Sequence, residues 1–187
     1  MKRKKLESTY SELETLCIGS PSGLSKNVVR GEGNVDSPVV FVGEAPGAEE
    51  DHQKRPFVGA AGRVLTSALE NAGWRRNDVF ITNLVKCRPP QNKPPRKLEI
   101  QHFLPYLRRE LEVIKPAVTC LLGATATRAL TGRQLAEIRG KTIEIDDRPY
   151  FSTYHPAAVV YNVSLEKMFF EHIIQLRKLV SDELSED

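Results

Sequence analysis

The sequence lacks the features that would mark a membrane or secreted protein. Its longest apolar runs, such as Val39-Val40-Phe41-Val42, are far shorter than the roughly 20 residues that a membrane-spanning helix needs. The basic start Met1-Lys-Arg-Lys-Lys is followed by Leu6-Glu-Ser-Thr instead of an apolar segment, so we expect no signal peptide. The cysteines, at positions 17, 87 and 120, are too few for a disulfide framework. We therefore expect a cytoplasmic protein in a reducing environment.

Strong compositional bias is also missing. Hydrophobic residues make up 40% of the 187 residues and charged residues 27%, which is typical of a globular protein and unlike a disordered or fibrous one. The length suits one well-packed domain, 1–187. A net charge of +3 is compatible with a polyanionic partner but does not require one.

Apolar periodicity predicts strands and helices that alternate along the chain. The run Val39–Val42 is continuous, which is typical of a strand buried on both faces. The segment 60–72 repeats apolar residues every three or four positions and stops at Gly73, as an amphipathic helix does. The same patterns predict helices at 4–17, 96–114 (interrupted near Pro105), 125–130 and 165–180, and strands at 79–85, 117–122, 141–145 and 150–154.

This alternation indicates an α/β protein with a mainly parallel sheet covered by helices on both faces. We expect an N-terminal helix and loop over residues 1–30 and an α/β core over 38–182. Ligands of such sheets bind beyond the carboxyl ends of the strands. The residues that follow each predicted strand are therefore the candidates for a functional site.

Chemically distinctive residues follow three of the strands. Gly43-Glu44-Ala45-Pro46-Gly47, with Glu50 close behind, can bring backbone N–H groups near a ligand, although a metal-binding loop and a solvated turn are alternatives. Phe57, which stands between a proline and a glycine and outside any amphipathic pattern, is either a core residue or a stacking platform for a planar ligand. Asn83 can read a donor and an acceptor side by side. His155 is either structural or catalytic.

Taken together, these segments resemble the family 4 uracil-DNA glycosylases. The resemblance runs from about residue 17 to 162, and its marks keep the family's order and intervals. They are Gly43-Glu-Ala-Pro-Gly with Glu50-Asp51, Arg55-Pro-Phe-Val-Gly, Thr82-Asn-Leu-Val-Lys-Cys-Arg-Pro-Pro, Leu122-Gly-Ala-Thr-Ala and His155-Pro. The resemblance implies a three-layer α/β/α sandwich with a central, mainly parallel four-stranded sheet. It also implies an enzyme of base excision repair that acts in the cell on uracil-containing DNA near the nucleoid.

The chemistry of uracil excision assigns a role to each candidate. Phe57 would stack under the extruded uracil, which offsets part of the cost of extrusion. The amide of Asn83 would accept from N3–H and donate to O4, the reverse of what cytosine presents. By resemblance, His155 contacts O2 as negative charge develops there, with help from the backbone N–H groups of Gly43 and Glu44. We assign Glu44 to the attacking water and Glu50 to exclusion of the thymine methyl.

Grip on DNA is expected from cations and from the segment after His155-Pro156. Lys86, Arg88 and Lys93 are candidates for phosphate contacts, and a solvated surface charge is the alternative for each. The segment that includes Ala158, Val159 and Val160 resembles the loop that wedges into the duplex where the base has left. It is less bulky than is usual in the family, which favours single-stranded DNA. The sequence carries no information on a sliding-clamp partner.

Most family 4 members bind a [4Fe–4S] cluster through four cysteines. This chain has Cys17 and Cys87 at two of those positions, whereas Ser20 and Ile100 stand at the other two. We therefore predict that the four-cysteine cluster is absent and expect no cofactor. Zinc or a three-ligand cluster that recruits His102, a Cys17–Cys87 pair, and simple packing of the two thiols remain alternatives.

The predicted function is that of a monofunctional uracil-DNA glycosylase, which uses water and leaves an abasic site. One alternative is a uracil-DNA-binding protein with weak turnover. Another is a glycosylase on the same scaffold for a different deaminated base, such as hypoxanthine.

Overall fold

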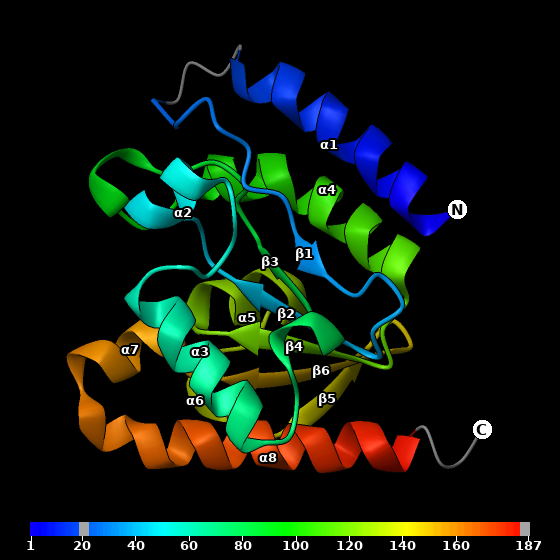
Figure 1. The fold of residues 1–187 in the computed structure, drawn as a ribbon, viewed down its shortest axis with the longest axis vertical. Helices are drawn as coiled ribbons and strands as arrows, with labels where there is room; N and C mark the ends of the chain where they lie inside the picture. Colours follow the sequence, from blue (N-terminus) through cyan, green and yellow to red (C-terminus); the bar gives the residue numbers. More distant parts are fainter. Residues whose placement is uncertain (19–22, 184–187) are drawn as a thin grey trace.

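A single mixed sheet lies at the centre of the computed structural model, which describes residues 1–18 and 23–183 (Figure 1). Its strands are β1 (Glu32–Gly33), β2 (Val39–Gly43), β3 (Phe80–Asn83), β4 (Val118–Leu122), β5 (Thr142–Ile145) and β6 (Arg148–Thr153). They lie in the order β1-β3-β2-β4-β6-β5. The four inner strands are parallel to one another, whereas β1 and β5 pair antiparallel at the two edges.

Helices cover both faces of this sheet. The longer ones are α1 (Lys2–Ile18), α3 (Ala60–Asn71), α4 (Lys97–Ile114), α5 (Ala124–Thr131) and α8 (Glu166–Glu183). The short ones are α2 (Ala48–Gln53), α6 (Leu135–Ile138), α7 (Pro156–Tyr161), and the 3₁₀ turns η1 (Arg76–Asp78), η2 (Pro90–Asn92) and η3 (Val163–Leu165). Helices α1 and α4 lie on one side of the sheet, and α3 and α8 on the other (Figure 1).

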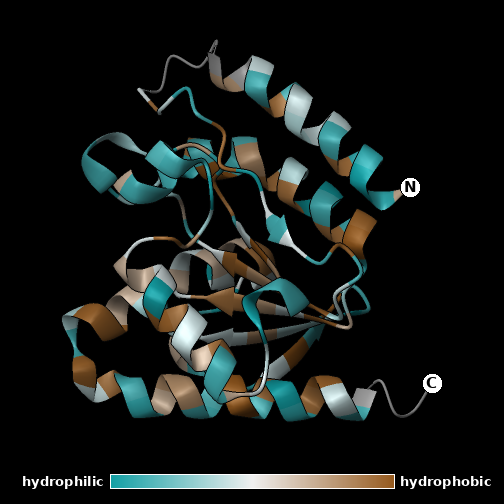
Figure 2. Ribbon diagram, viewed as in Figure 1, coloured by the Kyte–Doolittle hydropathy of each residue, from teal (hydrophilic) through white to brown (hydrophobic). Residues whose placement is uncertain are grey.

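The apolar residues divide between the two layers accordingly. Alternate residues of β2, such as Val40 and Phe41, face opposite cores. One core contains α4 residues such as Leu107, and the other contains α8 residues such as Phe169. Figure 2 shows the inner strands as the hydrophobic centre, with the polar faces of the helices outward. No helix within 1–18 or 23–183 is long and apolar enough to cross a membrane.

The predicted architecture is confirmed, with local differences. The predicted four-stranded sheet corresponds to the four parallel strands, and short antiparallel strands extend it at both edges. The expected interruption near Pro105 is wrong, because α4 continues through this residue. Pro105 is exposed, whereas Phe103, Leu107 and Leu111 are buried. Packing of that apolar face stabilises the helix despite the hydrogen bond that a proline cannot donate.

Candidate active site

A pocket of about 230 Å³ opens beyond the carboxyl ends of the parallel strands. Ligand pockets for drug-sized molecules usually enclose about 300–1,000 Å³, so this one suits a small ring system. Residues from several loops line it, namely Glu44, Ala45, Pro46, Gly47, Glu50, Phe57, Ala61, Asn83, Pro89, Asn92, Lys93, His155, Ala157 and Tyr161. The structure therefore brings together Glu44, Phe57, Asn83 and His155, which lie at or after the ends of three different strands in the sequence.

Asn83 presents an unpaired acceptor in this pocket. It is the last residue of β3, and its side chain is almost completely buried. Its Oδ1 atom has no hydrogen-bond partner within the described part of the chain. A buried amide oxygen without a partner is costly. A ligand that donates a hydrogen bond would remove that cost.

The ring of Phe57 forms one wall beside Asn83. Gly43, opposite Asn83 in the β2–β3 pairing, lies directly behind both residues. A side chain at Gly43 would collide with the amide oxygen of Asn83 and with the ring of Phe57. Gly43 is thus needed at this position for its lack of a side chain. The Phe57 ring also stacks on His155, with centroids 5.6 Å apart and planes 30° apart.

His155 is held as a neutral hydrogen-bond donor. Burial lowers its pKa to about 4, and the carboxylate of Glu50 only partly opposes this effect. The residue caps α7, where its Nδ1 accepts from the backbone N–H of Ala157 at 3.1 Å. A neutral imidazole that accepts at Nδ1 carries its proton on Nε2. The described residues provide no hydrogen-bond partner for that Nε2–H, so it can serve a ligand.

Glu44 directly follows β2 and also lines the pocket. Its Oε2 accepts a hydrogen bond from the hydroxyl of Thr125 in α5. This contact leaves Oε1 available to a water or a ligand. Thr125 belongs to the motif Leu122-Gly-Ala-Thr-Ala, but the sequence does not indicate its role, because only the fold brings α5 beside the residue that follows β2.

Glu50 lines the pocket, but its carboxylate is engaged by the backbone. Oε2 accepts from Gly47 N–H at 3.1 Å, while Oε1 accepts from Val58 and Gly59 at 3.0 and 2.9 Å. Glu50 therefore ties the loop after β2 to the loop that carries Phe57. This structural role was not predicted, and it accounts for all of the carboxylate contacts that the described residues make.

The predicted phosphate contact of Lys86 is wrong. Its side chain is fully buried and forms an ion pair with the equally buried Glu110 of α4. Burial accordingly lowers the pKa of Lys86, and Glu110 opposes this shift. Arg88 is half-buried and donates to Asn92 at 2.7 Å, whereas Lys93 is exposed at the pocket rim. The phosphate contacts of Arg88 and Lys93 therefore stay predictions.

The segment expected to wedge into DNA forms the short helix α7. Val159 faces the interior and is only 3% exposed, so the expectation that it contacts DNA is wrong. Its place in the core follows from helical geometry, which turns consecutive residues toward different sides. Ala158 is half-buried and Val160 is exposed. The projecting residue is Tyr161, which is 91% exposed and lines the pocket rim.

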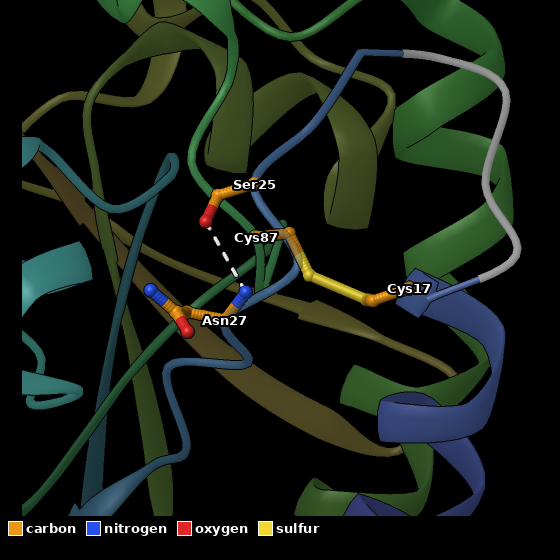
Figure 3. The surroundings of a disulfide bond; sticks show 4 residues. All are labelled: Cys17, Ser25, Asn27 and Cys87. Carbon is orange, nitrogen blue, oxygen red and sulfur yellow. Dashed lines mark hydrogen bonds between the residues drawn. A yellow bond between two sulfur atoms is a disulfide. The ribbon is translucent and has the colours of Figure 1, made fainter.

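The two cysteines at cluster positions are joined to each other. Figure 3 shows the disulfide between Cys17, in the last turn of α1, and Cys87, in the loop after β3. It corresponds to the pairing alternative and was not the leading prediction. Ile100 packs against the core that α1 and α4 share, and Ser20 lies outside the described residues. Among the described residues, no group of three or more His, Cys, Asp or Glu could hold a metal ion.

Comparisons with known proteins agree with this geometry. Residues 30–177, which include every pocket residue named above, match the family model described as "Uracil DNA glycosylase superfamily". A type-4 uracil-DNA glycosylase of Saccharolobus solfataricus is 42% identical over 167 residues, or 83% of this chain and 77% of that protein. One from Thermotoga maritima is 39% identical over 97% of this chain and 98% of that protein. A type-5 uracil-DNA glycosylase of Pyrobaculum aerophilum is 30% identical over 80% of this chain and 74% of that protein.

Proposed function

This chain belongs to the uracil-DNA glycosylase superfamily, and we propose that it hydrolyses the bond between uracil and deoxyribose in DNA. The product is an abasic site, and the cellular task is base excision repair of deaminated cytosine. The observation that carries the proposal is the buried, unpaired Oδ1 of Asn83 in a pocket of about 230 Å³. Uracil supplies the missing donor through its N3–H.

Discrimination against cytosine follows from the same amide. When Oδ1 of Asn83 accepts from N3–H, its NH₂ group can donate to O4 of the same ring. Cytosine has an unprotonated N3 and an amino group at position 4. The acceptor Oδ1 would then face an acceptor, and the donor NH₂ would face a donor. A site built to hydrogen-bond a substrate rejects an analogue that leaves its buried polar groups unpaired, often by factors of about 10⁴–10⁵.

Rate acceleration is assigned to His155 and Glu44. As the glycosidic bond breaks, negative charge collects on the uracil O2 and positive charge on the sugar. A neutral His155 that carries its proton on Nε2 donates to O2, and the hydrogen bond strengthens as that charge grows. Glu44, with one oxygen held by Thr125, positions the attacking water and offsets the sugar's charge. Backbone N–H groups at Gly43–Glu44 add to the stabilisation of O2.

DNA is gripped at the rim by Arg88, Lys93 and the end of α7. Tyr161 offers an exposed aromatic ring on which a neighbouring base can stack, which is worth about 1–3 kcal/mol. Ala158 and Val160 are too small to fill the space that an extruded base leaves in a duplex. We therefore propose a preference for single-stranded substrate.

We also propose that the enzyme works without an iron–sulfur cluster. Four thiolates hold such a cluster, and Ile100 offers no donor atom at one of the four positions. Cys17 and Cys87 are the two thiols available, and in this structure they bind each other. The donor set therefore does not fit the group. An iron and zinc assay with a visible absorption scan checks this, and a broad visible band with stoichiometric iron would contradict it.

The function is tested by release of uracil from oligonucleotides that carry one uracil, either single-stranded or opposite G or A. Wild type is compared with Asn83→Ala and His155→Ala, with thymine, cytosine and hypoxanthine substrates as controls. We expect the wild type to release uracil and none of the control bases, without an intermediate that borohydride can trap. Both variants should lose this activity. Tight binding without release would indicate a uracil-DNA-binding protein, and preferential release of hypoxanthine would mean a different base specificity.

A further inference from the structure

The backbone of Phe57 is held in an unusual conformation. Its φ angle is +52°, in the left-handed region that residues with a side chain rarely adopt. Its carbonyl lies so close to Gly62 of α3 that a Cβ there would collide with it. Residues persist in such conformations only when their surroundings fix them, and they concentrate at functional sites. Contacts on both sides of Phe57 hold it in this conformation.

Arg76 of η1 makes the contacts on one side. Its guanidinium donates to the carbonyl of Phe57 at 3.1 Å and also to the carbonyl of Pro56. Two successive carbonyls are thus bound by one planar guanidinium, whose donors are fixed relative to one another. Arg76 is 18% exposed, and its Nε lies 3.6 Å from Glu32 of β1. The ion pair with Glu32 therefore restrains the guanidinium of Arg76.

Glu50 makes the contacts on the other side. Its Oε1 accepts from the N–H groups of Val58 and Gly59, which directly follow Phe57. The carbonyls before and at Phe57 thus face a cation, and the N–H groups after it face an anion. This arrangement of opposite charges on opposite ends of one short loop determines where the aromatic ring stands.

We propose that Arg76, which lies outside the pocket, is a positioning residue that holds Phe57 ready to stack on the extruded uracil. The inference rests on the proposed function of the pocket. A ring that is already in place loses little conformational entropy when the base arrives. Without Arg76, the loop relaxes from its left-handed conformation and the ring moves away from Gly43 and His155.

The proposal predicts that Arg76 and Phe57 act as one unit. Phe57→Ala should slow single-turnover release of uracil about 5- to 150-fold, because base–aromatic stacking is worth about 1–3 kcal/mol. Arg76→Met should slow release by at most that factor, and it should add little to Phe57→Ala in the double variant. Arg75→Met is the matched control, because Arg75 is 88% exposed and pairs with Asp78 within its own turn. It should release uracil at the wild-type rate.

A second readout does not depend on catalysis. The ring of Phe57 stacks on His155 and contributes to the burial that lowers the pKa of the imidazole. In an NMR titration, Arg76→Met should move the pKa of His155 toward its ordinary value, while Arg75→Met leaves it unchanged. Arg76→Lys, which keeps the charge beside Glu32, serves if the Met variant does not fold, and it should show a smaller effect of the same sign.

The positioning role of Arg76 and the glycosylase function can fail independently. If Arg76→Met shifts the pKa of His155 but the wild-type protein releases no uracil, the positioning role of Arg76 is supported and the glycosylase function is refuted. If the effects of Arg76→Met and Phe57→Ala on the release rate are fully additive, the positioning role of Arg76 is refuted and the glycosylase function is not. The same holds if Arg76→Met leaves the pKa of His155 unchanged while the wild type is active. A loss of affinity for uracil-free DNA together with a smaller salt dependence would also refute the positioning role, because Arg76 would then be a phosphate contact.

Discussion

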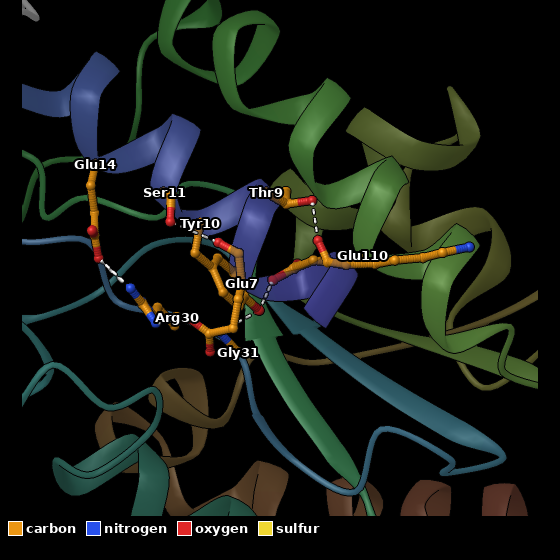
Figure 4. A network of polar contacts seen from close by, with 9 residues as sticks. Glu7, Thr9, Tyr10, Ser11, Glu14, Arg30, Gly31 and Glu110 are labelled. Carbon is orange, nitrogen blue, oxygen red and sulfur yellow. Dashed lines mark hydrogen bonds and ion pairs between the residues drawn. The ribbon is translucent and has the colours of Figure 1, made fainter. Parts of the chain in front are cut away.

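Replacement of Lys86 by Met should lower the free energy of unfolding and leave the salt dependence of DNA binding unchanged. Nζ of Lys86 donates to Glu110 and to the hydroxyl of Thr82, and the chain closes over all three groups. Tyr10 of α1 donates to the same carboxylate and accepts from Gly31, as Figure 4 shows. The network therefore joins α1, α4 and the strand that ends in Asn83.

The magnitude follows from what remains after the substitution. Removal of one member of a buried ion pair typically costs about 3–5 kcal/mol, because the other charge is left uncompensated. Two hydroxyl donors, from Tyr10 and Thr82, would still contact Glu110, so we expect the lower end, about 3 kcal/mol. For a chain of this length that corresponds to a fall in Tm of roughly 6–12 °C.

The assay is urea unfolding of wild type, Lys86→Met and the double variant Lys86→Met/Glu110→Gln. The double variant leaves no buried charge, so it should recover most of the lost stability. Arg88→Met is the comparison for DNA binding, because Arg88 lies two residues away and its side chain is only half-buried. It should reduce the salt dependence of DNA binding by about one phosphate contact.

The result that would refute this reasoning is the reverse pattern. If Lys86→Met kept the wild-type free energy of unfolding and reduced the salt dependence of binding, Lys86 would be a phosphate contact after all. Equal stability of the single and double variants would show that the charge of Glu110 is not what makes the loss of Lys86 costly.

Three further predictions test the site and its surroundings. Thr125→Val should slow uracil release about tenfold, because Glu44 loses the hydroxyl that orients it, and Thr125→Ser should restore the rate; equal rates for Val and Ser would contradict this. Since the pKa of His155 is about 4, the neutral form persists below pH 6, and the release rate should show no His155 inflection between pH 7 and 5; one near 6.5 that disappears in His155→Gln would contradict it. Because 70 residues separate Cys17 from Cys87, reduction should lower the free energy of unfolding by up to about 4 kcal/mol in wild type but not in Cys87→Ser, and a wild type insensitive to reductant would refute the bond.

The sequence by itself determined the sheet and the position of the pocket. A run such as Val39–Val42 is typical of a buried strand, and parallel strands bring their carboxyl ends to one edge. Glu44, Asn83 and His155 follow three different strands, so their convergence in one pocket could be predicted without coordinates. Phe57 could be singled out because it lies between a proline and a glycine, outside any amphipathic pattern.

Tertiary structure decided what each remaining polar group faces. Lys86 and Arg88 are two cations two residues apart, and no local pattern distinguishes the buried one, paired with Glu110, from the half-buried one. The partner of Lys86 lies 24 residues further along, in α4, where Glu110 also accepts from Thr82 of β3. The same holds for Arg76, whose targets precede it by about 20 residues. Pairings of this kind depend on distances between elements, which the order of residues does not contain.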